Sequence, residues 1–530
     1  MTESSSKAQT NWMPSVGDII FVLILMLLFV RMPNFIFGDG STGWHLVTGH
    51  YVLDHMQPPR VDLISYSFSD KPWVAYEWLF DAGIALMDKL AGLKLVAVAC
   101  CSAIAGLFLL LYEDCRKRGC HFLIAMVLCV MGALISAIHW LARPHLVTFF
   151  AVYIYTRFLQ DFFENKLSLK KLMLILGATM LIWVNSHPAF LMGIVIVGIY
   201  LVSDLLVYFS TSNSEARDQC FRRCKAFFFT LLVVLGVSFI NPYGLELYKY
   251  ILEYLQQTAV ISQTDEYGSP VFHGQLQSVL LELLFFALAV GLVCTEKKPA
   301  LPRLLTVLAY AHLTLTSKRN MPLFVIVSLP FIAELFANFR MTLLSPLQNA
   351  TLSPMLAPLK KLLVSTGETM NEMEFACTKH ALPIVTVLIL AISCLNNGHA
   401  LGINMVTSDF DPKTKPTKTL DYLKAHNFDE KRGFTFDNWG GYIRYKSGYH
   451  VFIDDRVDFY GQNYYLDYGN IATGQSNWKD TLNRYHIDWI LFPNNSVLVA
   501  NLKNDPDWSL VSEDEGACLY VRKNANPAKP

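Results

Sequence analysis

Apolar residues cluster into long runs as far as residue 400, and these runs then stop. A run of about 20 apolar residues is long enough to cross a bilayer as a helix. About eleven segments have this character, so the pattern predicts an all-α polytopic membrane domain over residues 1–400. The predicted spans are 17–37, 93–112, 121–141, 145–162, 170–186, 189–209, 225–241, 276–294, 301–317, 321–338 and 381–398.

The pattern changes in residues 401–530, where short apolar runs alternate with helical periodicity. Strand-like runs occur at Gly433–Phe436, Val451–Ile453, Trp489–Phe492 and Leu519–Val521. Helical patterns lie between them, at 417–426 and 476–486. This alternation predicts a small soluble α/β domain.

Basic residues orient the chain, because cytoplasmic loops carry an excess of Lys and Arg. They follow the even-numbered spans, as in Arg116–Arg118, Lys170–Lys171, Arg222–Arg223 and Lys297–Lys298, with Lys360–Lys361 after the tenth. The N-terminus is therefore predicted to be cytoplasmic. The C-terminal domain is predicted to lie on the outer face, which is the periplasm if the membrane is a bacterial inner membrane.

The first predicted outer loop, residues 38–92, is long and ends in an amphipathic pattern at Glu77–Leu90. We expect this pattern to form a helix lying on the membrane surface. The first apolar run lacks a small-residue cleavage site, so it is interpreted as an anchor and not as a cleaved signal peptide.

Composition excludes several classes of protein. Hydrophobic residues make up 53% of the chain, charged residues 16%, and the formal net charge is zero. Intrinsic disorder and a nucleic-acid binder built on a basic surface are both excluded. The chain also lacks GxGxxG, P-loop, G-x-S-x-G and H-E-x-x-H motifs, so nucleotide binding and serine or zinc hydrolysis have no direct support.

Candidate chemistry begins at Asp39, an acid directly after the first span and between two glycines that permit a tight turn. Ionisable groups at a membrane boundary are often functional. A helix cap or a solvated loop acid is the alternative.

Further polar residues fall at the predicted outer ends of the spans, among them Arg143, His187, Lys318 and Arg319. A guanidinium fork matches the oxygens of a phosphate, so cations held on this face favour a phosphate ligand. The alternative is pairing with lipid headgroups or with acids. In the C-terminal domain, Arg456 follows a strand-like run together with several acids, either at a ligand position or in an Asp–Arg pair that fixes a loop.

The order of these features resembles the GT-C superfamily, integral-membrane glycosyltransferases that use polyprenyl-phosphate-linked sugars. It resembles more narrowly a group of bacterial multi-pass proteins, mostly uncharacterised. The residues that carry the resemblance are Asp39, Trp44-His45-Leu46, Pro59-Arg60-Val61-Asp62, Ser65-Tyr66, Trp73-Val74, Glu77-Trp78-Leu79, Arg143-Pro144-His145, Asn185, His187, Asn241-Pro242-Tyr243-Gly244, Arg319-Asn320, Pro322-Leu323-Phe324, Asp454, Arg456, Asp458 and Tyr460-Gly461.

The resemblance implies that Asp39 is a general base, which deprotonates an acceptor as it attacks the anomeric carbon of the sugar. Many relatives carry a second acid two residues later, where this chain has Ser41, so we expect a site without a metal or other cofactor. The predicted substrate- and phosphate-binding residues are His45, Glu77, Arg143, His187, Lys318, Arg319 and Arg456. The expected partners are a polyprenyl-phosphate-linked sugar, membrane lipids and an acceptor of unknown identity, with no nucleic acid.

Two other functions fit the sequence. A transporter of a lipid-linked sugar would favour charged or broken helices at mid-membrane, whereas the charges here lie mainly at helix ends. A non-catalytic assembly protein would use the C-terminal domain to bind a partner.

Overall fold

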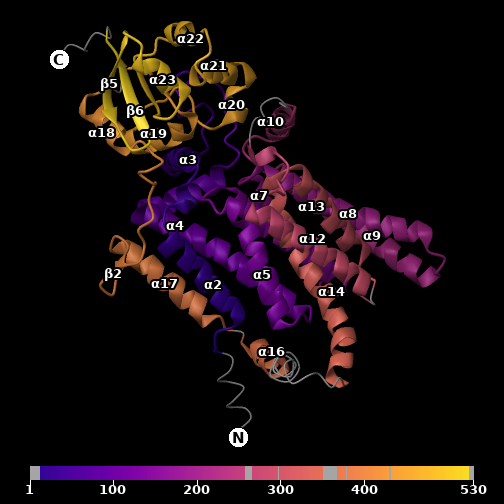
Figure 1. The fold of residues 1–530 in the computed structure, drawn as a ribbon. Coiled ribbons are helices and arrows are strands. Elements are labelled where there is room, and N and C mark those ends of the chain that lie inside the picture. The colour runs from indigo at the N-terminus through magenta and orange to yellow at the C-terminus, as the bar shows by residue number, and fades with distance from the viewer. Residues whose placement is uncertain are drawn as a thin grey trace.

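The computed structural model describes residues 12–256, 265–295, 298–349, 367–377, 379–428 and 431–523. A bundle of helices carries a small sheet-containing domain at one end (Figure 1). We call this the domain-bearing end of the bundle. Helices α3 and α10 lie there too, beneath the C-terminal domain and beside it.

The helices of the bundle coincide with the predicted spans, and each of the eleven segments is helical. Their bounds are α2 Val16–Met26, α4 Trp78–Lys117, α5 Phe122–Ser136, α6 His145–Phe163, α7 Leu169–Val184, α8 Leu191–Ser210, α9 Ser214–Ser238, α12 Leu276–Cys294, α13 Leu301–Thr316, α14 Met321–Asn349 and α17 Ala381–Leu395. Shorter helices connect them: η1 Leu27–Arg31, η2 Phe35–Phe37, α3 Thr42–His55, η3 Ala137–His139, η4 Pro188–Phe190, α10 Leu245–Leu255, η5 Asp265–Tyr267, η6 Lys318–Asn320 and α16 Gly367–Ala376.

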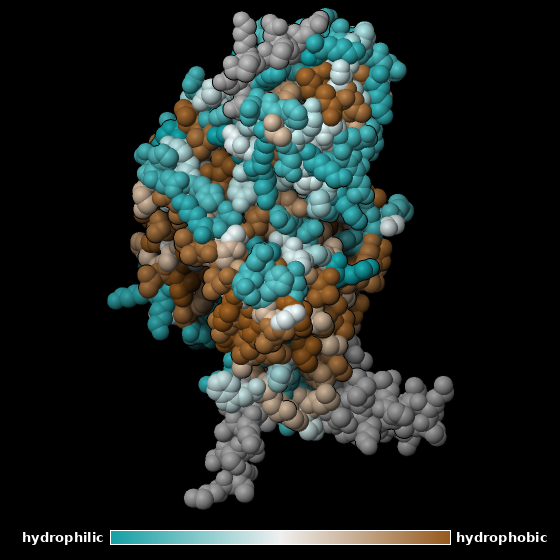
Figure 2. Space-filling model, turned by 90° about the vertical axis from the view of Figure 1, so that its left-hand side faces the viewer, coloured by the Kyte–Doolittle hydropathy of each residue, from teal (hydrophilic) through white to brown (hydrophobic). Residues whose placement is uncertain are grey.

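Five helical segments of the described residues are long and apolar enough to cross a membrane, and a sixth arises if the bent pair Thr369–Ala376 and Ala381–Leu395 is one span. Large apolar side chains cover the outside of the bundle, as at Phe209 and Val293, which are 77% and 84% exposed. Brown apolar surface covers much of the helical part, while the C-terminal domain is mostly teal (Figure 2). The chain is therefore an integral membrane protein. The count of eleven spans and the orientation stay predictions, and Lys297, Lys360 and Lys361 lie outside the described residues.

Helix α4 contains both the predicted surface helix and the second span. Its backbone breaks at Ala91 and Gly92, where Gly92 has a φ of 71°. Glycine adopts this left-handed conformation without a steric penalty. The amphipathic part before the break packs against α3, and a Cβ at Gly49 would lie 2.0 Å from the carbonyl oxygen of Asp81. This close packing fixes the geometry of the first loop.

The C-terminal domain has a four-stranded sheet in the order β3-β4-β6-β5. Strands β3 and β4 are parallel, and the other neighbours are antiparallel. The strands are β3 Gly433–Thr435, β4 Trp489–Pro493, β5 Trp508–Glu513 and β6 Ala517–Arg522, and a short hairpin, β1 His399–Ala400 and β2 Ile403–Asn404, precedes them. The helices are α18 Thr417–Ala425, α19 Asp437–Ser447, α20 Val457–Tyr460, α21 Gln462–Ala472, α22 Trp478–Arg484 and α23 Val497–Lys503. The predicted run Val451–Ile453 is the exception, since only Val451 makes a bridge, and it pairs with Ser65 of the first loop.

The first loop and the C-terminal domain are joined backbone to backbone. Tyr66 N–H donates to the carbonyl oxygen of Val451 at 3.0 Å, and Val451 N–H donates to that of Ile64 at 3.1 Å. Helices α3 and α19 also meet at glycines, because a Cβ at Gly43 would lie only 2.3 Å from the carbonyl carbon of Gly441. The domain is thus seated directly on the segment that carries Asp39.

Replacing Gly43 by alanine is expected to weaken the contact between the C-terminal domain and the first loop, since overpacking a close contact costs about 1–3 kcal/mol. Limited proteolysis of the link between β2 and α18 should then cut faster in the variant than in the wild-type protein. Gly469→Ala is the matched control, because a Cβ at Gly469 in α21 meets nothing within 4 Å. Equal cleavage rates for Gly43→Ala and Gly469→Ala would contradict the glycine contact.

Candidate active site

Asp39 lies at the start of the first loop, just before α3, and its side chain is 15% exposed. Its carboxylate accepts hydrogen bonds from Ser41 Oγ at 2.6 Å and Thr42 Oγ1 at 3.0 Å. Arg143 Nε lies 3.0 Å from Asp39 Oδ2. The local sequence therefore holds the carboxylate in place with two hydroxyl groups from the residues that open α3.

Arg143 lies in the turn between η3 and α6 and links two acids. Besides Asp39, its Nη1 donates to Glu266 Oε1 at 3.3 Å, and Glu266 belongs to η5. The Arg143 side chain is 28% exposed, so solvent or a ligand reaches the guanidinium. Two segments separated in sequence by more than 200 residues thus meet on one cation.

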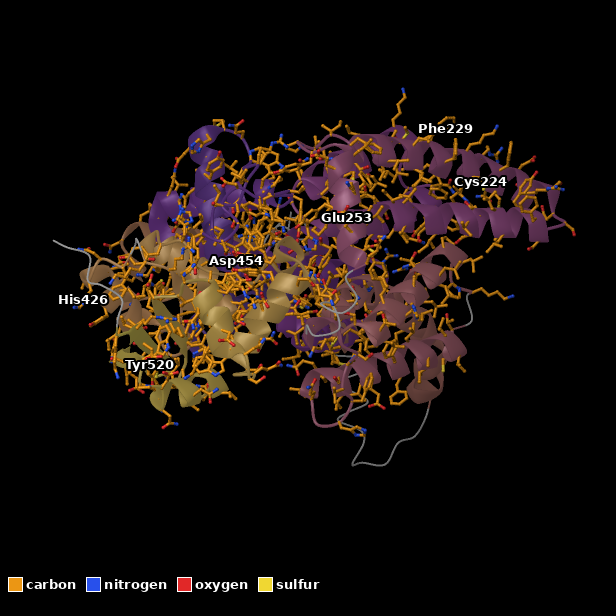
Figure 3. The ribbon with its side chains drawn as sticks, turned by 90° about the horizontal axis from the view of Figure 1, so that it is seen from above. Cys224, Phe229, Glu253, His426, Asp454 and Tyr520 are labelled. Atoms are coloured by element: carbon orange, nitrogen blue, oxygen red, sulfur yellow. The ribbon has the colours of Figure 1, made fainter. Side chains whose placement is uncertain are left out.

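The C-terminal domain contributes directly to this site. Lys415 Nζ donates to the carbonyl oxygen of Asp39 at 2.8 Å, and Lys415 is only 4% exposed. Asp455 accepts a hydrogen bond from Trp44 Nε1 at 2.9 Å, and it is partly exposed while its neighbours Asp454 and Arg456 are buried. In Figure 3, seen from above, Asp454 lies near the centre among closely packed side chains, whereas Tyr520 lies toward the outer side of the C-terminal domain.

The two carboxyl groups of the site have opposite electrostatic environments. Burial disfavours the charged form of Asp39, but Arg143, the Ser41 hydroxyl and Lys415 outweigh it and hold the pKa of Asp39 below its usual value. Burial, together with the charge on Asp39, raises the pKa of Asp455 to about 8, against the opposing effect of Arg143. At neutral pH, Asp39 is therefore a carboxylate and Asp455 a carboxylic acid.

Glu77 and His45 form a second, deeper layer. Burial raises the pKa of Glu77 to about 8, with Arg143 opposing. His45 is 1% exposed, its Nδ1 lies 2.7 Å from Asp81 Oδ1, and Glu77 Oε2 is 3.9 Å away. Burial and the nearby Arg143 hold the pKa of His45 well below its usual value. His45 is thus a neutral ring that ties α3 to α4, and this position disfavours the direct substrate contact predicted from the sequence.

The predicted cations and His187 also lie at the domain-bearing end. The Arg319 guanidinium is 4.5 Å from the centre of the Tyr267 ring, and Lys318 N–H donates to the carbonyl oxygen of Gly268 at 2.9 Å. His187 Nδ1 lies 2.9 Å from Thr148 Oγ1. Burial lowers the pKa of His187, and Arg319 and Arg143 add to that effect. The structure therefore brings these residues near Arg143 while leaving their predicted roles untested.

A cavity of about 180 Å³ adjoins the Arg143–Glu266 pair. It is lined by Ile138, His139, Glu266, Pro270, Gln275, Gln277, Ser278, Lys318 and Met321. His139 is 7% exposed, and its Nε2 has no hydrogen-bond partner among the described residues. A buried polar atom without a partner is costly, so this wall of the cavity favours a polar occupant.

Arg456 is buried and is held by carboxylates. Its guanidinium donates to Asp454 Oδ1 at 2.9 Å and to Asp62 Oδ1 at 2.7 Å, and the residue is 4% exposed. Asp62 also accepts from Ser65 N–H at 2.9 Å. This geometry disfavours the predicted phosphate contact and matches the other interpretation of the sequence, an Asp–Arg pair that fixes a loop.

The residues around Asp39 do not fit a divalent-cation site. A hard cation needs several oxygen ligands, but the Asp39 carboxylate is already engaged by two hydroxyls and Arg143, and residue 41 is a serine. No group of three or more His, Cys, Asp or Glu in the described residues is arranged to hold a metal. Independence of a metal stays a prediction.

Sequence reasoning missed two members of the site, Lys415 and Asp455. Lys415 lies in an irregular segment with no motif around it. Asp455 stood in the noted run of acids beside Arg456, but only the fold shows which of these acids faces Asp39. The paired glycines of the first loop and of Gly440–Gly441 are the available signal, because close backbone contacts need them.

No protein-family model matches the chain, and no curated protein matches it in sequence. Solved structures do resemble it. The apo oligosaccharyltransferase of Archaeoglobus fulgidus matches with a TM-score of 0.57 at 12% identity, over 90% of this chain and 69% of that chain. AglB of the same organism, in complex with an inhibitory peptide and a dolichol-phosphate, gives the same values. ArnT from Cupriavidus metallidurans in the apo state matches with a TM-score of 0.51 at 13% identity, over 97% of this chain and 98% of that chain.

These structures belong to GT-C glycosyltransferases, so the chain has the GT-C fold that its sequence resembles. The likeness covers both the helical bundle and the C-terminal part of the chain, and at these identities it is a likeness of fold.

Proposed function

We propose that this protein is a membrane glycosyltransferase that moves a sugar from a polyprenyl-phosphate-linked donor to an acceptor, with Asp39 as general base. The observation that carries the proposal is the Asp39–Arg143 pair at 3.0 Å, in a partly exposed site on a GT-C fold. A solved structure of this fold, AglB, contains a dolichol-phosphate. In this proposal the site faces the periplasm of a bacterial inner membrane.

The proposed reaction is a single displacement at the anomeric carbon. Asp39, ionised at neutral pH, accepts the proton of the acceptor as the acceptor forms its bond to the anomeric carbon. The bond between that carbon and the phosphate oxygen breaks, and its electron pair stays on the polyprenyl phosphate. Asp39 thus loses its negative charge at the moment when the phosphate gains one.

Arg143 is proposed to stabilise the negative charge that develops on the phosphate. In the resting site its guanidinium pairs with Asp39 and Glu266. When Asp39 becomes neutral, the Arg143 guanidinium is free to interact with the leaving phosphate. A preorganised donor of this kind stabilises the charge that develops in a transition state. Lys318 and Arg319, at the same end of the bundle, are proposed to contact the phosphate when the donor binds, with His187 beside them.

The experiment that tests the donor is an analysis of bound lipid. The wild-type protein and Asp39→Asn would be purified in mild detergent, and their lipids would be identified by mass spectrometry. We expect a polyprenyl phosphate or its glycosylated form on the wild type, and the glycosylated donor accumulating on the variant. A known amount of added polyprenyl phosphate controls for loss during purification. Only ordinary phospholipids on both proteins, with the added lipid recovered, would contradict the proposal.

Removal of divalent cations is expected to leave transfer unchanged, because the Asp39 carboxylate is stabilised by Arg143 and two hydroxyls. The measurement is the transfer rate before and after treatment with EDTA, with added Mg²⁺ or Mn²⁺ as the reverse test. A rate that falls at least tenfold with EDTA and returns with one of these cations would overturn the metal-independent site.

A further inference from the structure

Two acids of this site differ in charge state, and they come from different parts of the chain. Asp39 belongs to the first loop, while Asp455 belongs to the C-terminal domain that sits on that loop. Both act on Arg143 and on Lys415. This arrangement has a consequence for the leaving group of the proposed reaction.

We propose that Asp455 is the general acid of the transfer, donating its proton to the phosphate oxygen that leaves the anomeric carbon. The inference rests on the proposed function. The acceptor's proton goes to Asp39, the new bond forms between the acceptor and the anomeric carbon, and the carbon–oxygen bond to phosphate breaks. The departing oxygen takes the proton of Asp455, so the negative charge that would otherwise stay on polyprenyl phosphate ends on the Asp455 carboxylate, which also acts on Arg143.

The position of Asp455 supports this role. It lies between two buried residues, Asp454 and Arg456, yet it is itself partly exposed. One of its oxygens accepts from Trp44 Nε1 at 2.9 Å, which fixes the side chain toward the first loop. The glycine contact between α3 and α19 holds the first loop and the C-terminal domain, which carry Asp39 and Asp455, against each other. Glu266, the other carboxylate on Arg143, lines the cavity described above, so space for a ligand adjoins a partner of the same arginine.

Electrostatics supports the division of roles. Carboxyl groups of one site whose environments move their pKa values apart serve as acid and base. Asp39 is held ionised by Arg143, while burial keeps Asp455 protonated. The charged and titratable groups that face Asp455 are Asp39 and Glu77 of the first loop, Arg143, Lys415, Asp454 and Tyr465 of α21.

Glu77 is the competing acid, because its pKa is also raised to about 8. Glu77 lies beside the buried His45–Asp81 pair, 3.9 Å from the His45 ring nitrogen. Asp455, in contrast, shares both Arg143 and Lys415 with Asp39. A general acid at Asp455 and one at Glu77 would give different results in the same experiment.

The test is the pH dependence of transfer by the full-length protein, in vesicles of the lipid extract of its own membrane. Release of polyprenyl phosphate is followed by mass spectrometry from about pH 6 to about pH 10. A general acid must be protonated, so the wild-type rate should fall as the pH rises through about 8. Asp455→Asn should lower the rate by about 10²–10⁴-fold and remove this alkaline decline.

Two further variants separate the explanations. Glu77→Gln should keep the alkaline decline, and Asp467→Asn should keep both rate and decline, since Asp467 bonds only Tyr485 and Arg484 in the described contacts. A decline that disappears in Glu77→Gln and persists in Asp455→Asn would overturn the assignment. If Asp455→Asn does not fold, a wild-type rate that stays flat to about pH 10 would still overturn it. No release by the wild type at any pH would overturn the proposed function itself.

Discussion

Replacing Asp39 by asparagine is expected to lower sugar transfer by about 10²–10⁴-fold, the range typical for loss of a general base. Asparagine has nearly the shape of aspartate, and its carbonyl oxygen still accepts from Ser41 or Thr42, but it does not take up the acceptor's proton. The measurement is the transfer rate of the purified variant at saturating donor, because the loss falls on kcat and not on binding.

The control is Asp70→Asn, which removes an exposed acid of the same loop. It should transfer at the wild-type rate, and both variants should elute and unfold like the wild type. An Asp39→Asn protein with wild-type kcat would remove Asp39 as the base.

Replacing Arg456 by leucine is expected to destabilise the contact between the C-terminal domain and the first loop by about 3–5 kcal/mol, since removing one partner of a buried ion pair leaves the remaining charges without compensation. Asp454 is 0% exposed and Asp62 is 4% exposed, so neither carboxylate reaches water easily. The Arg456 guanidinium also lies 4.4 Å from the centre of the Trp73 ring, a contact that the variant loses. Thermal unfolding in detergent measures the effect.

Arg484→Leu is the matched control, because Arg484 is 60% exposed and pairs with Asp467 at the surface. Exposed pairs contribute about 0–1 kcal/mol, so this variant should unfold like the wild type. An Arg456→Leu protein that keeps wild-type stability but binds donor lipid more weakly would restore the phosphate-binding role predicted from the sequence.

The helical bundle was predictable because the apolar interior of a membrane strongly restricts which sequences can cross it. A segment that has no access to water must form its backbone hydrogen bonds within itself, so long apolar runs form helices. All eleven predicted runs are helical. The break after Glu77–Leu90 was visible as the end of an amphipathic pattern, although Gly92 carries the actual turn.

The strands of the C-terminal domain were harder to predict from the sequence. Its buried strand β4 stood out as an apolar run, whereas β5 alternates and has exposed positions such as Leu510, so it was not predicted. Val451–Ile453 has the composition of a strand, but its partner is the first loop and not the sheet. Pairing between segments almost 400 residues apart is a tertiary property that local pattern does not carry.

The candidate site shows the same division. Asp39, Arg143 and the other cations were identifiable because charge at the end of an apolar span is conspicuous. Lys415 and Asp455 were not, because they enter the site only when the C-terminal domain docks. Arg456, in turn, looked like a ligand-binding residue in the sequence, and only the distances to Asp454 and Asp62 reveal its carboxylate partners.

Conversion of the donor by the purified protein tests the proposed glycosyltransferase activity itself. The protein would be placed in vesicles of its own membrane lipids, and the ratio of glycosylated polyprenyl phosphate to free polyprenyl phosphate would be followed over time by mass spectrometry. We expect the wild type to convert the first lipid to the second with a matching gain of glycosylated acceptor, and Asp39→Asn not to do so. An unchanged ratio with the wild type, or equal conversion by both proteins, would contradict it.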